Sequence, residues 1–139
     1  LVRSRGLGDV YKRQGELYSG GQGTQKGSGV FIYLDTKNEC LKEPAEGVYK
    51  VWCSYKGDIT VWQGNKGKWE NSELEGLQIT PSVVPGGYEL AFTIPLNRSF
   101  NKDTMRLCAT LSTKTYTETL VHSNADWSCT WMKMNLGGH

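Results

Sequence analysis

The chain has 139 residues, which is enough for one domain with a modest core. Hydrophobic residues make up 37% and charged residues 22%, as in ordinary soluble globular proteins. The apolar residues occur in short runs, which excludes a helix that crosses a bilayer. Seventeen glycines and many Thr, Ser and Asn residues favour strands and turns over helices.

The first fourteen residues, LVRSRGLGDVYKRQ, differ from the rest. They resemble translated adapter sequence from assembled environmental DNA, so we set 1–14 apart as a non-native or disordered tail. A natural basic arm is the alternative. Without the tail the chain has 12 basic and 13 acidic residues and a net charge of −1 instead of +2. Its charge therefore indicates neither a nucleic-acid nor a membrane partner. If the tail is foreign, we expect a signal peptide and one or more N-terminal strands to be missing.

Four cysteines are present, namely Cys40, Cys53, Cys108 and Cys129. They contain no C-x-x-C pair, which argues against a zinc or redox motif. They allow up to two disulfides with three connectivities in an oxidising compartment. The alternative is that some are small buried hydrophobes.

The Gly-, Gln- and Ser-rich stretch 15–29 is predicted to be a flexible loop, and the predicted domain spans 30–139. Val30–Asp35 (VFIYLD) is β-branched and aromatic, which predicts a strand. The polar stretch 38–47 predicts a loop.

Val48–Tyr55 and Ile59–Gln63 are predicted to form a hairpin around Lys56-Gly57-Asp58. With a three-residue loop, Trp52 lies opposite Trp62 and both point away from the apolar face. Another turn, 64–68, leads to Trp69.

Further strands are predicted at 77–84, interrupted or edged at Pro81, and after the Gly86-Gly87 turn at 88–94. Strands at 105–111, 116–122 and 128–136 complete the series. Short strands separated by turns predict an all-β protein, an antiparallel sandwich of two packed sheets or a barrel.

Three segments resemble family 9 carbohydrate-binding modules and their DOMON-like relatives. These are GVFIYLDTKN, GVYKVWCSYKGDITVWQGNKGKWE and GGYELAFTIPL, and SNADWSCTWMKM is loosely similar to the closing strand. The resemblance covers about 30–136 and implies a jelly-roll-like sandwich that binds polysaccharide or oligosaccharide without catalysis. It also implies covalent attachment to a glycoside hydrolase or surface protein outside the cytoplasm: extracellular, periplasmic or at the cell surface.

Exposed tryptophans are the candidate carbohydrate-binding residues, because an indole ring matches the flat CH face of a sugar. Trp127 lies in a polar stretch and is the first candidate, while Trp62 and Trp52 share the face away from the predicted core. Trp69 follows a turn and is expected at a loop rim, where binding residues concentrate, and Trp131 is predicted to be core. The alternative for Trp52, Trp62 and Trp69 is structural packing. Hydrogen bonds to sugar are expected from Arg98, Asn97, Asn124 and Asp126.

Asp35, Asn38 and Glu39 share one turn and are candidate ligands for a structural Ca²⁺ ion, although they match no EF-hand loop. No other cofactor is expected, and none of the common catalytic motifs is present. Two further functions are alternatives. One is a haem-binding electron-transfer domain that uses residues among Met105, Met132, Met134 and His122. The other is a structural or adhesive sandwich without a small ligand.

Overall fold

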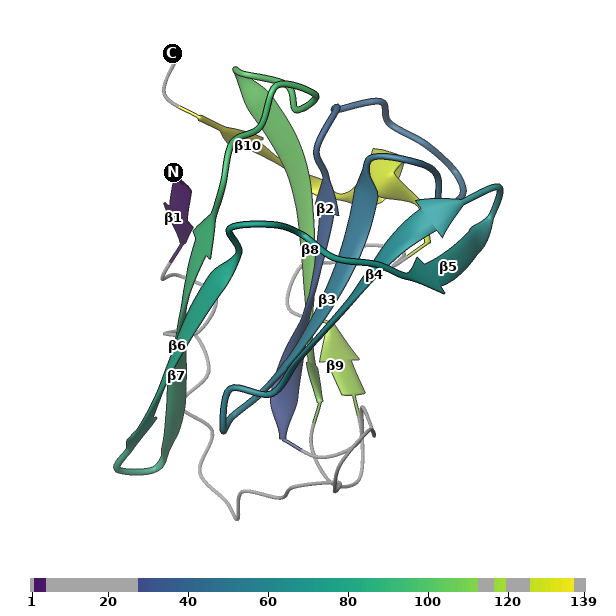
Figure 1. Ribbon diagram of the computed structural model, residues 1–139. Coiled ribbons are helices and arrows are strands. Elements are labelled where there is room, and N and C mark those ends of the chain that lie inside the picture. Colours follow the sequence, from purple (N-terminus) through teal and green to yellow (C-terminus); the bar gives the residue numbers. More distant parts are fainter. Residues whose placement is uncertain (1, 5–27, 113–116, 120–125, 137–139) are drawn as a thin grey trace.

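A computed structural model describes residues 2–4, 28–112, 117–119 and 126–136. In these residues the chain forms two antiparallel sheets that face each other as two layers (Figure 1). The all-β sandwich predicted from the turn spacing is therefore confirmed. The strands are β1 (Val2–Ser4), β2 (Gly29–Asp35), β3 (Val48–Ser54), β4 (Ile59–Asn65), β5 (Lys68–Asn71), β6 (Gln78–Val84), β7 (Gly87–Ile94), β8 (Thr104–Ser112), β9 (Thr117–Thr119) and β10 (Met132–Asn135), and a 3₁₀ turn, η1, spans Ser128–Thr130.

Strand β2 occupies the centre of the larger sheet. That sheet has the order β10-β8-β2-β3-β4-β5, with β9 also paired to β8. All seven residues of β2 pair with β3 on one side and with β8 on the other. The smaller sheet has the order β1-β7-β6. Because β2 has neighbours on both edges, its backbone hydrogen bonds are satisfied and its side chains alternate between the two faces of the sheet.

The main core lies between the two sheets. The alternation predicted for β7 is confirmed, since Tyr88, Leu90, Phe92 and Ile94 are all buried. The alternation predicted for β8 is confirmed as well, with buried Met105, Leu107, Ala109 and Leu111. The larger sheet completes this core through β2, whose Val30, Ile32 and Leu34 are buried in the same cluster.

The β3–β4 hairpin has the predicted faces but not the predicted register. Trp52 pairs with Thr60, and Trp62 pairs with Lys50. The hairpin closes one residue earlier than predicted, around 55–57, because Ser54 donates its amide to the carbonyl of Asp58 (2.9 Å) and its hydroxyl accepts from the Asp58 amide (3.1 Å). The register therefore shifts by two residues, and a shift of two keeps every side chain on its expected face.

Other boundaries differ locally from the predictions. Trp69 lies within the edge strand β5 rather than at a loop rim. Pro81 is accommodated in β6, an edge strand, as its missing amide proton requires. The predicted strand 128–136 begins instead with η1 and narrows to β10. Of the predicted strand 116–122, the structure describes Thr117–Thr119 as β9, and His122 lies outside the described residues.

Three residues of the set-apart tail are described. Val2–Ser4 form β1, which pairs with the C-terminal end of β7, so that Val2 lies opposite Ile94. Of the predicted loop 15–29, Ser28 and Gly29 are described, and 15–27 lies outside the described residues. The assignment of 1–14 as foreign and the domain limits at 30–139 stay predictions. Within the described residues, no helix is long and apolar enough to span a bilayer.

None of the four cysteines, all of which lie in the described residues, forms a disulfide, so the structure holds neither of the two disulfides that the sequence allowed. Cys53 and Cys108 are fully buried in different clusters, Cys53 in the inter-sheet core and Cys108 against Tyr33 on the opposite side of the larger sheet. They are the small buried hydrophobes of the alternative interpretation. Cys40 is exposed and Cys129 is half-buried.

Gly64 allows the 44–45 loop to pack directly on β4. A Cβ atom at this position would lie 2.2 Å from the amide nitrogen and 2.6 Å from the carbonyl oxygen of Ala45. Both atoms belong to the backbone, so the contact cannot be relieved by a side-chain rotation. We predict that Gly64→Ala destabilises the fold by about 2 kcal/mol or more, measured as a lower urea midpoint. The exposed Gln78→Ala change on β6 is the control, and equal midpoints for the two variants would contradict the packing described here.

The buried thiols predict an order of chemical reactivity. Burial raises the pKa of Cys53 to about 12, so its reactive thiolate is scarce at pH 8. A thiol reagent at pH 8 should label Cys40 first, with Cys53 and Cys108 labelled only in denaturant. Peptide mapping by mass spectrometry measures the order, and rapid labelling of Cys53 in the native protein would contradict it.

The same pKa has a consequence for stability at high pH. Because the pKa of Cys53 in the folded protein lies above the ordinary value of a cysteine thiol, 9.0, the stabilisation is complete below pH 9 and is lost as pH rises toward 12. Cys53→Ala should therefore reduce the alkaline loss of stability, measured as the change in urea midpoint between pH 8.5 and 10.5. A loss of the same size in both proteins would show that Cys53 does not contribute to it.

Candidate functional site

The outer face of the larger sheet, turned away from β6 and β7, carries a cluster of aromatic rings. Because alternate residues of β2 point outward, Phe31 and Tyr33 lie there, next to Trp52 of β3 and Trp62 of β4. Ring centroids of Phe31 lie 4.8 Å from Trp52 and 6.4 Å from Trp62, and Tyr33 lies 6.1 Å from Trp69 and 5.8 Å from Trp131. We call these six side chains the aromatic patch: Phe31, Tyr33, Trp52, Trp62, Trp69 and Trp131.

A single lysine lies at the centre of this patch. In register, Lys50 faces Tyr33 on one side and Trp62 on the other. Its Nζ is 5.1 Å from the ring centroids of Phe31 and Trp62, and 5.9 Å from those of Tyr33 and Trp69. These are cation–π distances to four rings. Burial lowers the pKa of Lys50, and the negative charge of Asp126 opposes that shift.

The segment 126–131 forms a rim beside the patch. Trp69 donates its indole N–H to Oδ1 of Asp126 (3.1 Å), which fixes the start of this segment against β5. The next residue, Trp127, is 43% exposed, and the Nζ atom of Lys42 lies 5.9 Å from its ring centroid. An exposed indole therefore lies one residue beyond the carboxylate that Trp69 bonds.

Hydrogen bonds fix the rim to the sheet and to the 38–43 loop. Leu41 donates its amide to the hydroxyl of Ser128 (2.7 Å) and accepts from the Cys129 amide (3.0 Å). Arg106 of β8 donates Nε to Asn38 Oδ1 (2.8 Å) and reaches the carbonyls of Cys129 and Trp131 at 3.5 Å. The position of Trp127 is thus set by contacts from three separate parts of the chain.

The structure brings together several of the residues that the sequence singled out, with different exposures. Trp52 and Trp131 are 2% and 3% exposed, and Trp62 and Trp69 are half-buried. A Cβ on Gly29 would come within 2.5 Å of the Trp52 ring, so this ring is packed against the backbone of β2. Trp52 and Trp131 therefore form the buried base of the patch. Trp62, Trp69 and Trp127 expose part of their ring surface to solvent. Asp126 lies beside them.

Two predicted site residues are not placed with the tryptophans. Arg98 is exposed in the turn after β7, and Phe100 of that turn packs against Tyr49 in the inter-sheet core. Neighbouring Asn97 accepts hydrogen bonds from the amide and hydroxyl of Ser99, so it stabilises the turn. Asn124 lies outside the described residues.

Of the three side chains proposed as Ca²⁺ ligands, Asp35 and Asn38 have structural roles in the loop. Asp35 is fully buried, and its two carboxylate oxygens accept the amides of Glu39 (3.2 Å) and Cys40 (3.0 Å). Asn38 donates to Thr104 and accepts from Arg106, and Glu39 is exposed. In the described part of the chain, no three His, Cys, Asp or Glu side chains are grouped to hold a metal ion.

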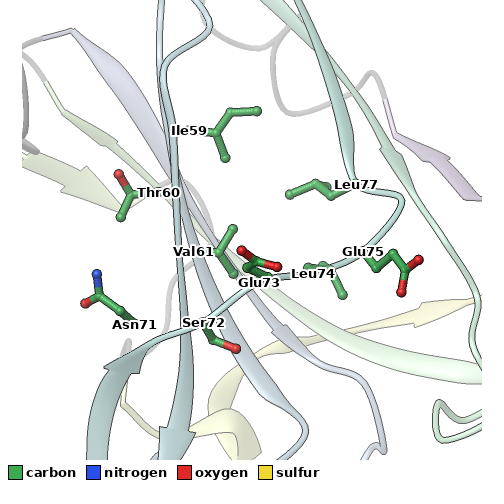
Figure 2. Close-up of a pocket in the computed structure, with 9 residues that line it drawn as sticks. All are labelled: Ile59, Thr60, Val61, Asn71, Ser72, Glu73, Leu74, Glu75 and Leu77. Atoms are coloured by element: carbon green, nitrogen blue, oxygen red, sulfur yellow. The ribbon is translucent and has the colours of Figure 1, made fainter.

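A cavity of about 680 Å³ lies at the open edge between the sheets (Figure 2). Ile59, Val61 and Leu77 point into it, while the carboxylates of Glu73 and Glu75 point in different directions. It contains no aromatic ring. Its side chains therefore provide neither a stacking surface for a sugar nor a convergent carboxylate pair for hydrolysis.

The three methionines of the haem alternative lie in different environments. Met105 is fully buried in the inter-sheet core, and Met132 is 47% exposed on β10. Met134 is partly buried against the core opposite Met105. Met105 is a packing residue, and nothing in these positions favours haem ligation.

No family model and no curated protein matches the chain. Two solved structures match it, both family 9 carbohydrate-binding modules from Caldicellulosiruptor kristjanssonii, one in complex with cellotriose (TM-score 0.67) and one with glucose (TM-score 0.69). The chain has the fold of family 9 carbohydrate-binding modules.

The match is one of three-dimensional structure rather than of amino-acid sequence. Identity is 13% in both cases, 91% of this chain is covered, and the chain spans 66% and 67% of the two family 9 structures. At the level of the fold, the family 9 resemblance carried by GVFIYLDTKN and GGYELAFTIPL is confirmed. The DOMON-like relationship stays a prediction.

Sequence reasoning missed Lys50, Phe31 and Tyr33 as members of the site. The available signal was the alternation of VFIYLD, which assigns Phe31 and Tyr33 to the face opposite Val30 and Ile32. Burial raises the pKa of Tyr33 to about 12, with a smaller contribution from Cys108. A strand with aliphatic side chains on one face and rings on the other is a sign that both faces are covered.

Asp35 is predicted to be a structural residue independent of calcium. Asp35→Ala removes a buried carboxylate and leaves the part-buried amides of Glu39 and Cys40 without their acceptors, and we expect a loss of about 2 kcal/mol in the free energy of unfolding. The exposed neighbour change Glu39→Gln is the control. Thermal unfolding with Ca²⁺ and with chelator should give the same midpoint for the unmodified chain, and a rise of several degrees with Ca²⁺ would contradict the assignment.

Proposed function

We propose that this chain is a non-catalytic carbohydrate-binding module whose ligand stacks on Trp127 and on the exposed parts of Trp62 and Trp69. The observation that carries this proposal is the exposed Trp127 ring, in the segment that Asp126 ties to Trp69 of the aromatic patch. An exposed indole is costly to order in water, and here hydrogen bonds from Trp69, Leu41 and Arg106 hold its segment in place. Such preorganisation favours a ligand over mere packing.

The chemistry of the patch matches a sugar. A pyranose has an apolar CH face and a rim of hydroxyls, so burying it on an indole removes apolar surface from water on both sides. Around the rings lie a donor, the Lys50 ammonium, and an acceptor, the Asp126 carboxylate. These groups are suited to the hydroxyls at the sugar rim.

Cello-oligosaccharides are the first ligands to test, because the two family 9 structures of the same fold are complexes with cellotriose and glucose. In the same proposal, the module directs an attached glycoside hydrolase or surface protein to polysaccharide outside the cytoplasm. The resemblance of 30–136 to family 9 modules supports this wider role. Sequencing the gene on both sides of this coding region would test it, since a glycoside hydrolase or surface-protein domain should be encoded in the same reading frame.

Trp127→Ala is predicted to weaken binding of cellotriose by roughly 30-fold, corresponding to about 2 kcal/mol for the loss of one stacked ring. Isothermal titration calorimetry measures the affinity, and circular dichroism checks that the variant is folded. Val83→Ala is the matched control, because Val83 is an exposed apolar residue on β6 in the other sheet.

Several outcomes separate the proposal from its alternatives. Unchanged affinity in Trp127→Ala would remove this ring from the site. A structural or adhesive sandwich would show no retardation in affinity electrophoresis on xylan, β-glucan or mannan gels. Loss of fold in Trp127→Ala would assign the ring a packing role, in contradiction to its exposure.

A further inference from the structure

Lys50 occupies an unusual position for a surface lysine. Most lysines extend into solvent, whereas the Nζ atom of Lys50 lies over four rings in the middle of a sheet face. Its place is fixed by the backbone register, since the strands on both sides of β3 present aromatic residues to it. The ammonium is therefore preorganised and partly removed from water.

Among the described carboxylates, Asp126 is the one whose charge acts on Lys50, and one of its oxygens already accepts the indole N–H of Trp69. A second cation, Lys42, flanks Trp127 at the rim. Each side of the proposed stacking surface thus has a lysine beside its rings.

We propose that this site prefers sugars that carry a carboxylate, and that Lys50 is the residue that recognises that group. The inference rests on the proposed carbohydrate-binding function and names the class of its ligand, the uronic acids. In a uronic acid the carboxylate lies at the edge of the pyranose ring, so the CH face stacks on an indole while the anion reaches an ammonium beside it. A charge-assisted hydrogen bond in a partly desolvated site is stronger than one in water.

The test compares two trisaccharides that differ in one group. Cellotriose carries neutral CH₂OH groups, and β-1,4-linked triglucuronic acid carries carboxylates at the same positions. At low salt and pH 7, we expect the full chain to bind the acidic trisaccharide about tenfold more tightly than cellotriose. The preference should fall at high ionic strength, because salt screens charge pairs.

Lys50→Met keeps an unbranched apolar stem and removes the charge. We expect the ratio of the two affinities to fall to about one in this variant. Lys56→Met in the β3–β4 turn is the control, since Lys56 is exposed and lies beside Tyr55, which packs on the inner core. In that variant the tenfold ratio should persist.

The outcomes separate this inference from the function on which it rests. Binding of neither trisaccharide contradicts the carbohydrate-binding proposal itself. Equal binding of both by the unmodified chain overturns the preference for acids and leaves the carbohydrate-binding function standing. A preference that survives in Lys50→Met overturns the role of Lys50. If Lys50→Met does not fold, the ratio in the unmodified chain and its salt dependence still decide whether the site selects acidic sugars.

Discussion

The pairing of β2 on both edges is the constraint on which the rest of this structure depends. All seven of its residues pair with β3 and with β8, so its twist and register are set from two sides. Its side chains must then alternate strictly: Val30, Ile32 and Leu34 enter the core between the sheets, and Phe31 and Tyr33 enter the aromatic patch. A shift of one residue would exchange the two sets and place aliphatic side chains where the rings now lie.

The outer face combines buried aromatic rings with partly exposed ones. Trp52, Trp131 and Tyr33 are buried and supply contacts that hold the outer rings in place. Trp62, Trp69 and Trp127 are more exposed and leave ring surface available. Between these two groups, Lys50 brings a charge to a surface that is otherwise apolar, and its cation–π contacts offset part of the cost of removing that charge from water.

Much of the scaffold was predictable from local pattern, and the assembly of the site was not. The alternation of Tyr88, Leu90, Phe92 and Ile94 predicted one buried face, because that pattern depends only on the two-residue period of a strand. The pairing of Trp52 with Thr60 was missed, since it depends on how Ser54 and Asp58 close the hairpin. The burial of Trp52 depends on its packing over Gly29, a contact between strands that no local pattern reveals.

Long-range contacts also explain the remaining differences. Trp69 follows a Gly-rich turn, and only its pairing opposite Gly64 shows that it belongs to a strand. Lys50, between Tyr49 and Val51, reads as an ordinary solvent-facing lysine until β2 and β4 place rings on both sides of it. Asp126 was chosen as a polar group near Trp127, but its partner, Trp69, lies 57 residues away.

The central claim is that the outer face of the larger sheet, at the rim carrying Trp127, receives the ligand. The most direct measurement is a titration of ¹⁵N-labelled protein with cello-oligosaccharide, followed through the indole N–H resonances of the five tryptophans. We expect the signals of Trp127, Trp69 and Trp62 to shift on binding, while those of buried Trp52 and Trp131 change little. Saturable binding that leaves the signals of Trp127, Trp69 and Trp62 unmoved would contradict this placement of the site.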